Sequence, residues 1–89
     1  SKFIDLAGRL ARKFESQGNH GGARAVYLRA IDRYPTSAVC YEGLIRNRLA
    51  MKDAAGAIED YERYLRVIGA TREATPSPAM RTLVGALLR

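Results

Sequence analysis

The chain has 89 residues, 47% hydrophobic and 27% charged, with 15 Lys and Arg against 9 Asp and Glu and a net charge of +6. This length supports one hydrophobic core, so we expect a single domain over residues 1–89. No apolar run approaches the roughly 18 residues of a membrane span, and one cysteine permits no internal disulfide, so we expect a cytoplasmic protein without membrane contact. The excess of basic residues suggests two classes of partner, nucleic acid or an acidic protein.

Residues 2–17 form the first predicted helix. Apolar residues recur there at steps of three and four, which is the spacing of one buried helix face. The expected core stripe consists of Phe3, Leu6, Ala7, Leu10, Ala11 and Phe14. A turn is expected at residues 18–20, where Gly18 tolerates a positive φ. His20 is the only histidine, so we interpret it as an exposed turn residue rather than as half of a metal site.

Residues 21–34 form the second predicted helix, which ends before Pro35 because proline cannot continue it. Much of this region recurs 34 positions later. The matching pairs are Gly22 and Gly56, Ala23 and Ala57, Tyr27 and Tyr61, Arg29 and Arg63, and, just upstream, Leu10 and Leu44, and Arg12 and Arg46. This period is typical of the tetratricopeptide repeat, two antiparallel helices joined by a tight turn. We expect the paired alanines to allow close helix contacts and the paired tyrosines to fill the gaps beside them.

The third and fourth predicted helices cover residues 38–51 and 54–68. Thr36 or Ser37 is expected to cap the third helix, and Asp53 the fourth. The residues expected inside are Tyr41, Leu44, Ile45, Ala57, Ile58, Tyr61, Tyr64 and Leu65, with Cys40 buried or half-buried. A fifth helix is expected after the Ser77 cap, from Pro78 to residue 88. Its apolar face consists of Met80, Leu83, Val84 and Leu87.

This pattern predicts an all-α fold with five helices. We expect a tetratricopeptide-like right-handed α-α superhelix, in which two helical hairpins stack on each other. The first repeat covers about residues 4–37 and the second about residues 38–71. The last helix, about residues 77–88, is interpreted as a cap that closes the end of the stack.

Most charged residues are interspersed along the helices. Opposite charges four positions apart predict ion pairs on solvated helix faces, and these pairs are Asp5 and Arg9, Glu59 and Arg63, and Glu62 and Arg66. The neighbouring acids Glu59 and Asp60 are both assigned to an outer face in water. The chain shows no catalytic triad, phosphate-binding loop or metal-ligand spacing, so we expect no enzyme activity and no cofactor.

The first helix of each repeat is expected to line the inner surface of the stack and to leave a groove for a protein or peptide segment. The expected groove residues are Asp5, Gly8, Arg12 and Glu15 from the first repeat and Val39, Glu42, Arg46 and Leu49 from the second. Arg12 and Arg46 hold equivalent positions, where they would offer forked donors to a partner's carboxylate. The alternative is that each arginine pairs with an acid of its own groove, such as Glu15 or Glu42.

Much of the chain, about residues 7–88, also resembles the bacterial transcriptional activator domain. This domain is a tetratricopeptide-like module found beside winged-helix DNA-binding domains in antibiotic-regulator-type regulators. The residues that carry the resemblance are Pro35, Tyr41, Leu44, the Tyr61-Glu62-Arg63 segment and the Pro76-Ser77 segment. The second repeat is degenerate, as in that family. It has Arg48, Tyr64 and Gly69 where the first repeat has Phe14, Ala30 and Pro35.

The resemblance implies a protein-protein interaction and regulatory domain of a bacterial transcriptional regulator, acting by self-association or by binding a signalling partner. The chain begins Ser-Lys-Phe without an initiator methionine, so we expect a fragment of a larger protein in which another domain contacts DNA. Because the stack is short, we expect a homodimer or packing on an adjacent domain. The alternative function is a general tetratricopeptide-repeat adaptor in an assembly unrelated to transcription.

Overall fold

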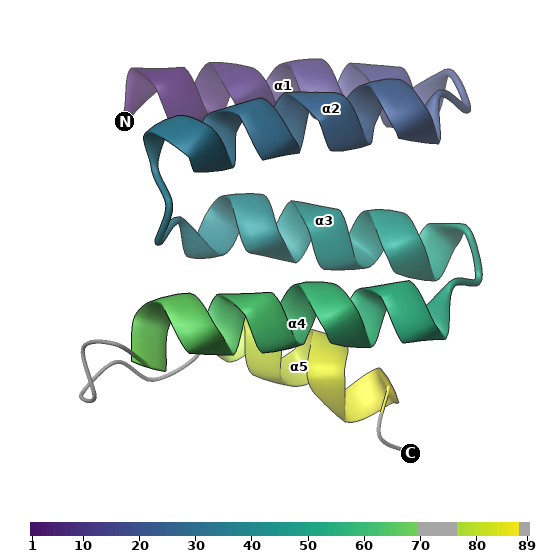
Figure 1. The fold of residues 1–89 in the computed structure, drawn as a ribbon. Coiled ribbons are helices and arrows are strands. Elements are labelled where there is room, and N and C mark those ends of the chain that lie inside the picture. The colour runs from purple at the N-terminus through teal and green to yellow at the C-terminus, as the bar shows by residue number, and fades with distance from the viewer. Residues whose placement is uncertain (70–76, 88–89) are drawn as a thin grey trace.

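The computed structural model describes residues 1–69 and 77–87, most of which lie in α-helices. In order these are α1 (Lys2–Ser16), α2 (His20–Arg33), α3 (Ala38–Ala50), α4 (Ala54–Gly69) and α5 (Pro78–Leu87). Figure 1 shows α1 and α2 as one antiparallel pair and α3 and α4 as a second pair below it. Helix α3 contacts all four other helices and is the centre of the domain. The prediction of an all-α fold is therefore confirmed.

Each helix begins where a short polar side chain satisfies a free backbone N–H group. The cap acceptors are Ser1, Asn19, Ser37, Asp53 and Ser77, which accept from the N–H groups of Ile4, Gly22, Cys40, Gly56 and Met80 respectively. The predicted caps at Ser37, Asp53 and Ser77 are thus confirmed. Local sequence determines where these helices start because the capping side chain and the N–H group that it binds are only three residues apart.

Two tight turns have a positive φ at equivalent places in the two hairpins. Gly18 has φ 74° and Lys52 has φ 58°, and these residues are separated by the repeat period of 34. His20 does not lie in the first turn, because Asn19 caps the helix and His20 becomes its first residue. His20 is half-buried, and its carbonyl accepts a hydrogen bond from the side-chain Nδ2 of Asn47 at 2.9 Å. The expectation of an exposed turn histidine is therefore wrong.

The core extends from the first hairpin through α3 to α5. Its buried members are Ala7, Ala11, Ala23, Tyr27, Ala30, Ile31, Cys40, Tyr41, Leu44, Ile45, Ala57, Tyr64, Ile68 and Met80. Tyr27 is almost completely buried, as predicted, whereas its repeat equivalent Tyr61 is only half-buried. The prediction that Cys40 is enclosed is confirmed.

Several large apolar residues assigned to the core are exposed instead. In α1, Phe3, Leu6 and Leu10 retain 42%, 61% and 47% of their accessible surface, while Ala7 and Ala11 are buried. Ala7 and Ala11 belong to the core. The ring of Phe3 lies 5.7 Å from that of Tyr34, at the end of α2, and Leu6 and Leu10 border an open hollow beside α2. In α4, Ile58 and Leu65 are also exposed. The side chains of Val84 and Leu87 and the expected boundaries at residues 71 and 88 lie outside what the structure describes.

Candidate functional site

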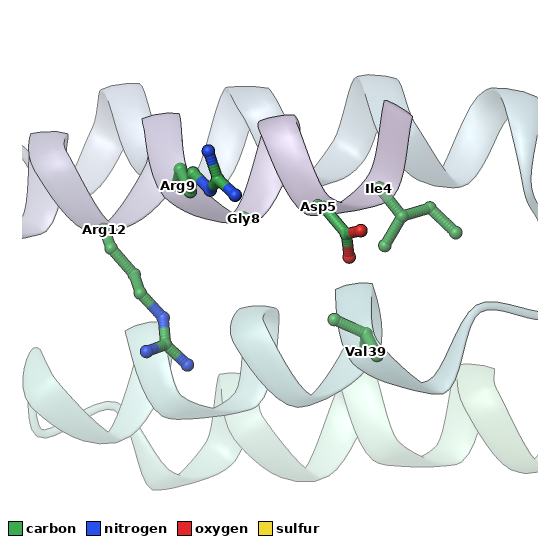
Figure 2. Close-up of a pocket in the computed structure, with 6 residues that line it drawn as sticks. All are labelled: Ile4, Asp5, Gly8, Arg9, Arg12 and Val39. Atoms are coloured by element: carbon green, nitrogen blue, oxygen red, sulfur yellow. The ribbon is translucent and has the colours of Figure 1, made fainter. Parts of the chain in front are cut away.

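A groove lies between α1 and α3, where the first helices of the two hairpins face each other (Figure 2). Its volume is about 290 Å³, and its lining residues are Ile4, Asp5, Gly8, Arg9, Arg12 and Val39. Four of these residues, Asp5, Gly8, Arg12 and Val39, belong to the groove set that the repeat pattern indicated. A side-chain Cβ at Gly8 would meet no atom of the described residues within 4 Å, so this residue leaves open space between its charged neighbours.

The two ends of the groove carry opposite charges. Figure 2 shows Asp5 and Arg12 extending from α1 toward α3, with Val39 facing them from α3. Asp5 and Arg12 are separated by two turns of helix, which corresponds to about 10 Å along the axis. The groove therefore offers a guanidinium donor at one end and, at the other, a carboxylate acceptor beside the apolar side chains of Ile4 and Val39 (Figure 2).

The other four predicted groove residues have different contacts. Glu42 accepts a hydrogen bond from the hydroxyl of Ser77, the residue that caps α5. Leu49 is half-buried and packs against the core. One carboxylate oxygen of Glu15 is buried and has no hydrogen-bond partner among the described residues. The Arg46 Nη2 atom lies 3.5 Å from the hydroxyl oxygen of Tyr27. These four residues do not line the hollow that contains Asp5 and Arg12.

The hydroxyl of Tyr27 marks the place where Arg12, Glu15 and Arg46 come together. Burial raises the pKa of Tyr27, and the Glu15 carboxylate raises that pKa further, whereas Arg46 and Arg12 act in the opposite direction. Neither arginine forms an ion pair with Glu15 or Glu42 within residues 1–69 and 77–87. Arg12 therefore lines the groove with its hydrogen-bond donors free of any described carboxylate.

Sequence reasoning missed a second charged cluster, which links the two hairpins. Asp60 of α4 accepts two hydrogen bonds from Arg24 of α2, at 2.9 Å from Nη1 and 3.0 Å from Nη2. The Nε atom of Arg48 lies 3.4 Å from the same carboxylate, and its Nη1 atom lies 3.1 Å from Asp53. Asp60 is only 6% exposed, so its assignment to a solvated outer face is wrong, while Glu59 is exposed as expected.

A signal for this cluster was present in the repeat alignment. Asp60 stands 34 positions after Val26, and Arg48 stands 34 positions after Phe14, so two apolar residues of the first repeat become opposite charges in the second. A charge at an inward-facing repeat position needs a partner, because an unpaired buried charge is very costly. The complementary change at both positions therefore indicates an internal ion pair.

The ion pairs predicted between residues four apart are not formed. Among the described residues, ion pairs join Arg24 to Asp60 and Arg48 to both Asp53 and Asp60. Exposed pairs at this spacing contribute only about 0.2–0.5 kcal/mol, too little to hold two long side chains in one geometry.

Comparison with protein-family models, with curated proteins and with solved structures finds no match to this chain. Within the described residues, no group of His, Cys, Asp and Glu is arranged to hold a metal ion. None of the helices in that part of the chain has the length and apolar character needed to cross a lipid bilayer. The interpretation of the groove therefore rests on its own geometry and on the repeat pattern.

Proposed function

We propose that this protein is a tetratricopeptide-type interaction module that binds a segment of a partner protein in the groove between α1 and α3. The observation that carries this proposal is the position of Arg12, whose guanidinium lines an open groove without an acidic partner among the described residues. The stacked hairpins and the matching turns at Gly18 and Lys52 support a right-handed superhelical arrangement.

The groove favours a partner segment with a particular order of charges. An arginine binds a carboxylate through two parallel hydrogen bonds, so a Glu, an Asp or a chain terminus suits Arg12. Asp5, two turns away, suits a basic or hydrogen-bond-donating residue of the same segment. Ile4 and Val39, at the Asp5 end of the groove, would contact its apolar side chains (Figure 2). An extended segment of four or so residues would cover this distance.

We assign this module to the regulatory part of a bacterial transcriptional regulator, in the cytoplasm, where it mediates self-association or contact with a signalling partner. The resemblance carried by Tyr41, Leu44 and Ser77 supports this assignment. In the structure, Tyr41 and Leu44 are completely buried and Ser77 caps α5, so these residues maintain the fold rather than form the binding surface. DNA contact belongs to another domain in this proposal. A general adaptor outside transcription would use the same groove.

The groove proposal is tested with an array of short extended peptides that carry an acidic, a neutral or a basic residue in the same apolar context. We expect acidic peptides to bind best, and we expect Arg12→Gln to weaken that binding about tenfold because a charge-assisted hydrogen bond is lost. Arg66→Gln, on the exposed surface of α4, serves as the matched control and should leave affinity unchanged. Equal loss in both variants would show that only general charge attraction operates.

A further inference from the structure

A second surface of α1 carries exposed apolar residues, and its leucines do not line the α1–α3 groove. A hollow of about 400 Å³ along α1 and α2 is lined by Phe3, Leu6, Ala7, Leu10, Val26 and Arg29. Leu6 is 61% exposed and Leu10 is 47% exposed, although both are large aliphatic residues. Adjacent leucines with this degree of exposure are typical of a surface that a partner covers.

The equivalent surface of the second hairpin, on α3, is covered by another helix. Leu6 and Leu10 correspond, at the repeat offset of 34, to Cys40 and Leu44 of α3, which are 1% and 0% exposed. Helix α2 lies against that side of α3, as shown by the contact of the Tyr27 ring with Gly43. The equivalent side of α1 therefore has the right spacing of residues to receive a helix.

The two repeats differ at two positions of this surface, so a helix that docks on α1 must differ in sequence from α2, which docks on α3. Gly43 and Asn47 of α3 correspond to Arg9 and Lys13 of α1. A Cβ atom at Gly43 would lie 2.3 Å from the Cζ atom of Tyr27, so the covered surface admits its helix only because position 43 has no side chain. Asn47 binds the carbonyl of His20. On α1 these two positions are the exposed cations Arg9 and Lys13, which would pair favourably with carboxylates on the docking helix.

The surroundings of this surface are also mainly basic. The hollows that adjoin the apolar one are lined by Lys2, Asp5, Leu6 and Arg9 on one side and by Phe3, Arg29, Asp32 and Arg33 on the other. Basic side chains therefore outnumber acidic ones around Leu6 and Leu10. Two copies of this chain meeting through this face would bring like charges together, which opposes a symmetric dimer here.

We propose that the outer face of α1, formed by Phe3, Leu6, Arg9, Leu10 and Lys13, binds an amphipathic helix of a partner protein with apolar residues on one side and carboxylates beside them. The leucines bury against the apolar side of this helix, and Arg9 and Lys13 pair with its acids. This surface adjoins the groove that contains Arg12 and shares Arg9 with it, but Leu6 and Leu10 do not line that groove.

The experiment uses two synthetic peptides of about 15 residues, a length at which a docked amphipathic helix can form. Both carry the same leucine face, and the flanking positions are Glu in one peptide and Lys in the other. Each is titrated against the 89-residue chain by fluorescence anisotropy at low and high salt. We expect the Glu peptide to bind at least about tenfold more tightly at low salt, with the difference falling as salt screens the charges.

Variants separate the apolar and charged contributions. Leu6→Gln with Leu10→Gln should weaken Glu-peptide binding about tenfold or more, and Lys13→Glu should reduce the preference for the Glu peptide. Lys13 is chosen because Arg9 also borders the groove. Arg12→Gln is the matched control and should leave binding of this peptide unchanged, which separates this proposal from the groove. Circular dichroism checks that each variant is folded.

Three outcomes would overturn the proposal. The first is equal affinity for the Glu and Lys peptides at low salt. The second is Glu-peptide binding that survives the Leu6 and Leu10 substitutions. The third is self-association of the wild-type chain in sedimentation runs that is lost in the double leucine variant, because a second copy would then be the occupant of this face.

Discussion

Asp60 shows how a single residue joins the two hairpins. Its carboxylate is buried beside Arg24 of the first hairpin and Arg48 of the second, and Arg24 binds both of its oxygens. Burying a charge costs several kcal/mol unless it is paired and hydrogen-bonded, and these two arginines provide that pairing. The arginine side chains retain 21% and 25% of their exposure, so each can still reach water when its partner is removed.

Replacing this carboxylate tests the network. Asp60→Asn keeps the size of the side chain and removes its charge, so the free energy of unfolding should fall by about 2 kcal/mol, less than for a fully enclosed pair. Urea denaturation measures the change. Glu59→Gln is the adjacent control on the solvent side and should lie within about 0.5 kcal/mol of wild type. Equal stability of the two variants would contradict an internal role for Asp60.

The contact between α2 and α3 depends on a glycine. Gly43 is buried, and a Cβ atom placed there would lie 2.3 to 2.7 Å from three ring atoms of Tyr27. The ring therefore occupies the space that any side chain at position 43 would need. The absence of a side chain allows the two helices to pack closely at the junction between the hairpins, and the Tyr27 hydroxyl is thereby placed near Arg46.

Two glycines inside helices give opposite predictions, because one is packed against a ring and the other faces open space. Gly43→Ala gains up to about 1 kcal/mol of helix propensity but displaces a buried ring, so we expect a net loss of about 1–3 kcal/mol. Gly8→Ala meets nothing within 4 Å and should be neutral or stabilising by up to about 1 kcal/mol. Thermal denaturation compares both with wild type. A stabilised Gly43→Ala variant would show that the α2–α3 packing is looser than described.

At the scale of the whole molecule, α5 closes the side of the core that α3 and α4 leave open. Met80 of α5 is completely buried, and α5 contacts both of these helices. The Ser77 hydroxyl, at the start of α5, donates to Glu42 of α3 and accepts from the N–H group of Met80. The opposite end of the stack, at α1, has no such cover among the described residues, so the two ends of the domain differ.

Truncating the side chain of Met80 tests whether α5 belongs to the same cooperative unit as the hairpins. Met80→Ala leaves a cavity and should cost about 2–4 kcal/mol of unfolding free energy. Thr82→Ala, on the exposed side of α5, should change it by less than about 0.5 kcal/mol. Hydrogen exchange of α3 and α4 amides should accelerate only in the Met80 variant. If the Met80→Ala variant accelerated hydrogen exchange only in α5, this helix would open independently of the hairpins.

The sequence by itself determined the helices, most of their caps and the repeat offset, because these depend on residues a few positions apart or on a period that is visible in the chain. Ser37, Asp53 and Ser77 cap the helices as predicted, and Ala23 and Tyr27 are buried as predicted. Half of the residues that the repeat register assigned to a groove, Asp5, Gly8, Arg12 and Val39, line one hollow.

Only the tertiary structure decided which apolar faces are covered and which charges are internal. Leu10 and Leu44 occupy the same position in the repeat, yet one is half exposed and the other is completely buried. Their local sequence cannot distinguish them, because burial depends on whether another helix lies alongside. In the same way, Glu42 meets Ser77 across 35 positions and Asp60 meets Arg24 across 36, distances at which helical periodicity carries no information.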